Sequence, residues 1–154
     1  MRTLLSVALF TGLVVPALSA QTAAAKPARN WGPAPAAFPS GAKMAVVSGD
    51  PGKAGVFTIE LLMPSEYHIP PHFHPTAEHV EVQKGTLMVG MGDVLDLKQA
   101  KPLATGDTGT IPANDHHFAV AKGTVVVSIT AMGPFAMTYV NAKDDPRKTG
   151  GAGY

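Results

Sequence analysis

The residues best suited to chemistry lie between His72 and Glu78. His72 and His74 are two positions apart, and alternate side chains of an extended strand share a face, so the two imidazoles can converge on one ion. Pro75 ends this strand, and Glu78 begins the next alternating stretch on an otherwise apolar inner face. A carboxylate placed there is costly unless it is paired or binds a metal. A further ligand must come from later in the chain, and His117 is the candidate.

Short stretches of alternating apolar and polar residues surround this motif and predict β-strands. Phe57, Ile59 and Leu61, for example, are expected to point inward and Glu60 outward. Strands are also expected at residues 44–47, 72–74, 78–83, 86–92, 108–111, 116–120, 125–131 and 135–140, with a break at Gly123 and a loop over residues 93–101. Many short strands, Gly/Pro turns and no convincing helix predict a single all-β domain, a sandwich or barrel, over residues 42–141.

The N-terminus has the three parts of a secretory signal. A basic start at Arg2 is followed by an apolar stretch too short to span a bilayer and by small residues before a cleavage point after Ala20. We therefore expect residues 1–20 to be removed, leaving a periplasmic or secreted protein with no membrane span. The lack of cysteine excludes disulfides, a thiol ligand and a thiol nucleophile. A formal net charge of +1 without any Lys/Arg cluster argues against nucleic-acid binding.

Two segments outside the domain have distinctive compositions. Residues 21–41 are rich in Ala and Pro and are expected to form an extended arm. Trp31 and Phe38 are the large apolar residues of this arm, and we expect them to dock on the domain or on a neighbouring subunit rather than to bind a ligand. Residues 142–154 include a Gly-rich run and are expected to be a flexible tail.

Two motifs of the chain resemble those of the cupin superfamily, whose members are small jelly-roll β-barrels. The first family motif, G-x5-H-x-H-x3,4-E-x6-G, is similar to His72, His74, Glu78 and Gly85, with Glu66 standing where its opening glycine would fall. The second, G-x5-P-x-G-x2-H-x3-N, is similar to Gly106, Pro112 and His117, with Asn114 in place of its internal glycine and Ala121 in place of its asparagine. Asn114 also tolerates the left-handed conformation of a glycine.

The resemblance covers about residues 31–141 and implies a cupin-type jelly-roll β-barrel, similar to small exported single-domain cupins. It also implies that one divalent metal binds to His72, His74, Glu78 and His117, with one or two positions left for water or substrate. Three imidazoles and one carboxylate suit Fe, Mn, Zn, Ni or Cu, and the ligand set alone does not choose among them. Cupins commonly form homodimers, so the resemblance also implies a homodimer, with the apolar arm crossing to the partner.

The other polar residues near these motifs have weaker claims to a catalytic role. His116 precedes the expected ligand and points away from it by parity, unless a shift of register in the preceding turn lets it replace His117. His79 is expected to be structural or interfacial. No general acid or base is obvious inside the barrel, and Tyr67 and His116 are the nearest candidates.

Two classes of function fit these residues. The first is a metal-dependent, dioxygenase-like enzyme acting on a small apolar, enolic or aromatic substrate, because the expected lining is apolar: Phe57, Ile59, Val80, Val82, Val127 and Ile129, with Met88, Phe118 or Tyr139 near the mouth. The absence of a strand-borne Arg or Lys argues against oxalate-decarboxylase-like chemistry and sugar-nucleotide epimerisation. The second is a non-catalytic metal- or small-ligand-binding module, a sensor or carrier, because the fold alone does not decide function.

Overall fold

A computed structural model describes residues 28–148 of the chain. Its strands are β1 Gly32–Pro33, β2 Lys43–Ser48, β3 Gly55–Met63, β4 His68–Phe73, β5 Glu78–Met91, β6 Lys101–Ala104, β7 Thr108–Ile111, β8 His117–Gly133 and β9 Thr138–Tyr139. A short 3₁₀ helix, η1 (Ala142–Asp144), follows. The described residues contain no α-helix, so the expected all-β domain is confirmed. No helix in this part of the chain is long and apolar enough to cross a membrane.

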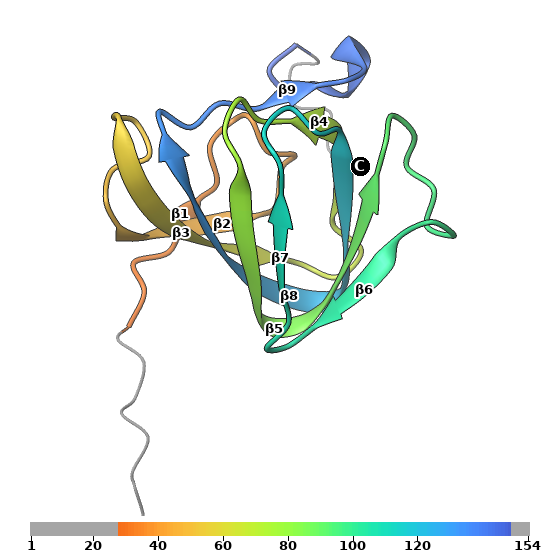
Figure 1. The fold of residues 1–154 in the computed structure, drawn as a ribbon. Coiled ribbons are helices and arrows are strands. Elements are labelled where there is room, and N and C mark those ends of the chain that lie inside the picture. The colour runs from red at the N-terminus through yellow and green to blue at the C-terminus, as the bar shows by residue number, and fades with distance from the viewer. Residues whose placement is uncertain (1–27, 149–154) are drawn as a thin grey trace, which may run out of the picture.

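Two long strands, β5 and β8, form the frame of the molecule. They run antiparallel, and β8 also pairs with β3 through its C-terminal half and with β4 through its N-terminal half. The full order is β1-β2-β3-β8-β4-β9, while β5 carries β6 and β7 on its other edge. The sheet therefore curls on itself into a barrel, with the strands around a common interior (Figure 1).

Alternation along the strands places the apolar core inside this barrel. Phe57, Ile59 and Leu61 of β3 are buried, as their spacing predicts, and they pack with apolar residues of β5 and β8. Glu60 was expected on the outer face, yet it is only 3% exposed. Arg29 lies over it: Nε donates to Oε2 at 2.7 Å and Nη2 donates to Oε1 at 3.1 Å. An ion pair with the N-terminal arm thus covers the outer face at this point.

Several boundaries differ from the sequence-based expectations. Gly123 does not break the chain into two strands, because β8 continues through it with a φ of 71°. Gly85 has a φ of 82° and lies where the register between β5 and β8 shifts. This irregularity changes which side chains face inward, so that Leu87 is buried in the core and Met88 is only partly buried. Strand β6 forms at residues expected to be loop and turn, and β9 is shorter than the expected strand 135–140.

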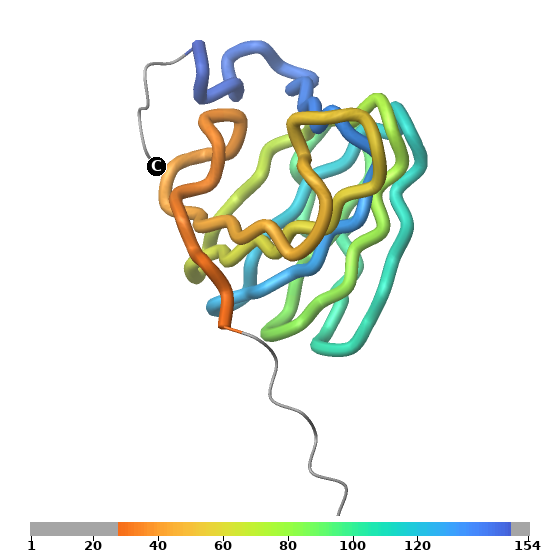
Figure 2. Tube along the Cα trace, turned by 90° about the vertical axis from the view of Figure 1, so that its left-hand side faces the viewer, coloured from red at the N-terminus to blue at the C-terminus, as the bar shows by residue number. Residues whose placement is uncertain are grey.

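The two ends of the described chain lie against the barrel (Figure 2). In the arm, Phe38 is buried in the core and Trp31 is partly buried, so docking on the domain is confirmed for Phe38. Residues 142–148, expected to be flexible, have a defined conformation: Asp145 is buried, and Arg147 donates to its carboxylate and to the carbonyl of Met137. The expected signal, residues 1–20, lies outside the described residues, as does the end of the expected tail.

Candidate metal centre

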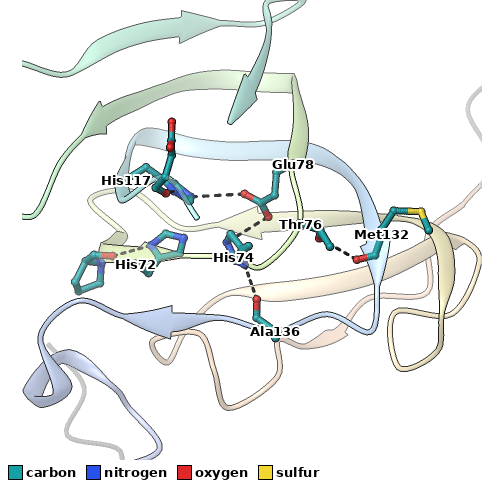
Figure 3. Close-up of polar contacts among 9 residues, drawn as sticks. His72, His74, Thr76, Glu78, His117, Met132 and Ala136 are labelled. Carbon is teal, nitrogen blue, oxygen red and sulfur yellow. Dashed lines mark hydrogen bonds and ion pairs between the residues drawn. The ribbon is translucent and has the colours of Figure 1, made fainter. Parts of the chain in front are cut away.

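The four predicted ligands come together at one end of the barrel. His72 lies in β4, His74 directly follows that strand, and Glu78 and His117 are the first residues of β5 and β8. Pairing of β4 with β8 sets His72 opposite His117. The four side chains point toward one another (Figure 3), and each is between 3% and 6% exposed. The pairing of the end of β4 with β8, together with the place of His74 two residues after His72, therefore brings residues far apart in the chain to one buried point.

Distances from Glu78 to two of the histidines match those of ligands around one ion, and the ring nitrogens of the three histidines form a compact cluster. One ring nitrogen from each of His72, His74 and His117 lies within 4.8 Å of the others. Glu78 lies against them, with Oε1 3.4 Å from His74 Nε2 and Oε2 3.6 Å from His117 Nε2. Two atoms bound at about 2.0–2.2 Å to a shared metal are separated by roughly 3.0–3.6 Å at ordinary coordination angles. The three histidines could thus hold a metal ion.

Backbone carbonyls fix the orientation of all three rings. The Nδ1 atoms of His72, His74 and His117 lie 2.7, 2.7 and 3.0 Å from the carbonyl oxygens of Pro70, Ala136 and Asp115. A carbonyl oxygen can only accept, so each Nδ1 must carry the proton and donate it. In the neutral ring the remaining nitrogen, Nε2, then presents a lone pair to the centre of the cluster.

The electrostatics of the cluster call for a cation. Lone pairs on Nε2 of His74 and His117 face the carboxylate oxygens of Glu78, an arrangement that is unfavourable unless a metal or a proton lies between them. Burial lowers the pKa of His72 well below its ordinary value, and neighbouring His117 and His74 lower it further. His72 is therefore neutral near pH 7, which is the form that binds a metal. The donor set, tautomers and spacing all fit a divalent metal.

A small cavity of about 40 Å³ adjoins the cluster. Its only polar side chains among the described residues are the three histidines and Glu78; the rest of the lining is apolar, namely Phe38, Leu61, Met63, Ile69, Val80, Leu87, Val89, Ile111, Ala119, Val127, Ile129 and Met137. A water molecule needs at least about 10–15 Å³ of such space, so the cavity has room for an ion with a few waters or for a small ligand group.

The structure corrects part of the predicted lining. Val80, Val127 and Ile129 line the cavity as expected, whereas Phe57, Ile59 and Val82 are buried in the core and do not line it. None of the side chains expected near the mouth lines the cavity: these are Met88, Phe118 and Tyr139. Phe118 packs instead against Gly90, where an added Cβ would lie 2.0 Å from the phenyl ring.

Neither catalytic candidate reaches the cavity. The Tyr67 hydroxyl donates to the carbonyl of Pro39, and burial raises the pKa of this tyrosine, which keeps it protonated. His116 points away from the cluster, as parity predicts: its Nδ1 is 2.6 Å from Asp93 Oδ1, and its ring stacks on Phe73 with centroids 4.9 Å apart. The register is thus the one that brings His117, not His116, to the cluster.

Sequence reasoning missed nine apolar residues of the lining. Seven of them lie in strands, namely Leu61, Met63, Ile69, Leu87, Val89, Ile111 and Ala119, and the other two are Phe38 and Met137. Both come from outside the long strands. Phe38 is a large apolar residue, and the sequence therefore indicated that it docks on the domain. It lies outside the predicted strands, so alternation could not show that it faces the cavity. Met137 lies in the segment 135–140, which was expected to be a single strand. No pattern in this segment indicates that Met137 faces the cavity.

Comparison with known proteins gives matches only at the level of structure. No protein-family profile and no curated protein matches the sequence. The polyketide cyclase RemF from Streptomyces resistomycificus is similar over 79% of this chain and 88% of its own, with a TM-score of 0.64 and 18% identity. A cupin 2 domain-containing protein from Halorhodospira halophila is similar over 72% and 78%, with a TM-score of 0.56 and 18% identity.

A recombinant oxalate oxidase in complex with glycolate is similar over 68% of this chain and 58% of its own, with a TM-score of 0.51 and 22% identity. At these identities the likeness concerns the fold and leaves the activity open. Proteins with different activities share this barrel, and the chain described here has its strand arrangement. The chain therefore has the cupin fold, an all-β jelly-roll barrel.

Proposed function

We propose that the protein binds one divalent transition metal through His72, His74, His117 and Glu78. The observation that carries this proposal is the convergence of the Nε2 side of the rings on one buried point, with each Nδ1 hydrogen bonded to a carbonyl. Such an arrangement holds the rings ready for a metal before it binds. Three imidazoles and one carboxylate suit Fe, Mn, Zn, Ni or Cu.

We further propose that the bound metal serves a dioxygenase-like reaction on a small substrate that is largely apolar and carries an enolic or phenolic oxygen. When bound, the metal supplies a site for O2 and polarises the substrate oxygen. The apolar lining would hold the body of the substrate and exclude water, while the absence of Lys, Arg, Ser, Thr and Tyr from the described lining disfavours a highly charged substrate.

The choice of reaction class follows from the scarcity of proton-transfer groups in the lining of the cavity. Apart from the four proposed ligands, no side chain of residues 28–148 that lines the cavity can accept or donate a proton. Incorporation of both atoms of O2 into the substrate consumes all four oxidising equivalents of O2 and needs no external reductant. It therefore depends least on groups that this cavity lacks. The polyketide cyclase and the oxalate oxidase show that the fold is found in enzymes.

Oxygen consumption tests this proposal. Metal-free protein is reloaded with Fe(II) without air, then mixed with O2 and either catechol or acetylacetone, an aromatic and an enolic probe. The expected result is substrate-dependent O2 uptake that is absent from metal-free protein and from His74→Ala. Fe(II)-loaded protein that consumes no O2 with either probe would contradict the enzymatic proposal while leaving metal binding intact.

One observation favours a second candidate, a non-catalytic metal- or ligand-binding module. A cavity of about 40 Å³ leaves little room beyond an ion and its waters. A site saturated by protein ligands would be structural, whereas a catalytic site keeps a position open. X-ray absorption of the metal-loaded protein, with and without catechol, distinguishes the two: a change in the coordination shell supports the enzyme, and an unchanged four-coordinate shell supports the module.

Export and assembly belong to the proposal as well. Cleavage after Ala20 and a periplasmic or secreted location remain predictions, testable by N-terminal sequencing of protein from each cell fraction. A homodimer remains a prediction from the resemblance to cupins, and light scattering during size-exclusion chromatography tests it.

A further inference from the structure

A short segment of the N-terminal arm covers the cavity. We call residues 34–42 the pocket strap. The amide of Ala34 donates to the carbonyl of Ala42 at 3.0 Å, which closes the strap into a loop, and the amide of Phe38 donates to the carbonyl of Pro35 at 2.9 Å. At its centre, Phe38 is 5% exposed and lines the cavity. The strap is the orange segment beside the barrel in Figure 2.

Two tyrosines hold the strap on either side of this phenylalanine. The hydroxyl of Tyr139 donates to the carbonyl of Ala37 at 2.7 Å, and the hydroxyl of Tyr67 donates to the carbonyl of Pro39. Both tyrosines are buried members of the core, one from β9 and one from the turn before β4. Residues far apart in the sequence thus fix the backbone directly before and after Phe38.

An aromatic contact links the strap to the candidate metal centre. The ring of Phe38 stacks on Phe135, with centroids 5.7 Å apart and planes 9° apart. Phe135 in turn contacts His74, with ring centroids 5.4 Å apart. Phe38 therefore occupies space next to the histidine cluster that a ligand with a larger body would need.

We propose that Phe38 is the specificity-determining residue of the site and limits its ligands to a single ring that enters only in part, or to a shorter apolar body, bearing one oxygen donor. The inference rests on the proposed function for the identity of the site. Tyr67 and Tyr139 act as positioning residues, because they touch the strap and not the cavity. Loss of the phenyl ring joins its volume to the cavity and lets a larger aromatic body enter.

The test compares phenol with 2-naphthol as probes of one and two rings. Dissociation constants are measured by calorimetry for metal-free protein and for protein loaded with Co(II), whose visible spectrum also reports ligands at the metal. Phe38→Ala is expected to bind 2-naphthol at least about tenfold more tightly than the wild type, with a smaller change for phenol, as for other pocket volume changes. Val125→Ala, which truncates a fully buried core side chain outside the lining, is the control and should leave the selectivity unchanged.

A second variant guards against loss of folding. Tyr67→Phe/Tyr139→Phe removes only two hydroxyls and releases the strap, so it should raise the affinity for 2-naphthol by at least about threefold, the effect of weakened hydrogen bonds. Unchanged selectivity in both variants, or binding of 2-naphthol to neither, overturns the role of Phe38. Failure to bind Co(II) would refute the metal proposal alone, because the metal-free titrations still report size selection.

Discussion

At the scale of single residues, main-chain carbonyls rather than other side chains orient the candidate metal ligands. The carbonyls of Pro70, Ala136 and Asp115 accept hydrogen bonds from Nδ1–H of His72, His74 and His117 in turn. Orientation of the rings is therefore built into the backbone of β4 and of the segments before β8 and β9. Substitutions of neighbouring side chains should leave the tautomers unchanged, so the site is preorganised by the fold itself.

The sequence predicted the ligands but not what orients them. Spacing alone placed His72 and His74 on one face, and parity favoured His117 over His116 unless the preceding turn shifted the register. The carbonyl of Ala136, by contrast, lies 62 residues from the ring that it orients, and no residue type marks it. Every residue has a main-chain carbonyl, so the sequence does not show which carbonyl accepts a hydrogen bond from a given histidine. Only the structure identifies these acceptors.

A second residue-scale feature gives a pH dependence. Hydrogen bonds from the Arg147 side chain lower the pKa of Asp145 below its ordinary value. A carboxyl group with a lowered pKa in the folded state stabilises the protein above its ordinary pKa of about 4, and the contribution is lost as the pH falls through the folded-state value. The difference in unfolding free energy between the wild type and Asp145→Asn should therefore shrink between pH 6 and pH 3. A difference that stays constant in urea titrations across this range would contradict the assignment.

At the scale of elements, glycines and a few residues with positive φ control the path of the strands. The register between β5 and β8 shifts at Gly85, so the side chains of β5 that face inward after this point are not those that alternation predicted. Gly123, with its positive φ, lets β8 continue where a break was expected. Alternation predicted β3 and β7 closely, because their strands are regular. It failed in β5 and around Gly123, because a bulge changes parity without changing the composition of the segment.

Glu66 provides an element-scale prediction. It occupies the position of the opening glycine of the first cupin motif and has a φ of 60°, in the left-handed region. Its side chain is exposed. Glu66→Gly should therefore stabilise the protein by about 0.5–1 kcal/mol, because glycine adopts this conformation without a steric cost.

Urea denaturation measures this effect, with Glu66→Ala as the matched control. Alanine also removes the carboxylate but keeps the Cβ, so it should give no stabilisation. Equal stabilisation by glycine and alanine would mean that the side chain, and not the backbone conformation, was responsible. Within residues 28–148, Asn114 is the other non-glycine residue with a positive φ, of 65°, and its place in the second motif is compatible with this conformation.

At the scale of the whole molecule, the N-terminal arm is part of the barrel. Its residues cover the outer face of β3 through Arg29 and Glu60, pair with β2 through β1, and cover the candidate metal centre through Phe38. From the sequence, we predicted a boundary between an arm and a domain at residue 42, because the Ala- and Pro-rich composition ends there. Contacts between the two parts come from residues that are far apart in the chain, and composition does not report them.

Arg29→Ala tests the contribution of the arm to the fold. It removes two hydrogen bonds from a buried carboxylate, so it should lower the thermal midpoint of unfolding. Lys53→Ala is the control, because it breaks an ion pair with Asp50 whose two side chains are 79% and 50% exposed. Exposed pairs contribute little, so this variant should unfold close to the wild type. Equal midpoints for Arg29→Ala and Lys53→Ala would show that the arm adds little to stability.

The most direct measurement is metal content per chain in untagged protein, determined by elemental analysis for the wild type, His117→Ala and His116→Ala. The two histidines are neighbours in sequence, but only His117 faces the cluster. We expect about one transition-metal ion per chain in the wild type and in His116→Ala, and loss of most of it in His117→Ala. A full complement of metal in His117→Ala, or no metal in wild-type protein supplied with each candidate ion, would contradict the proposed metal centre.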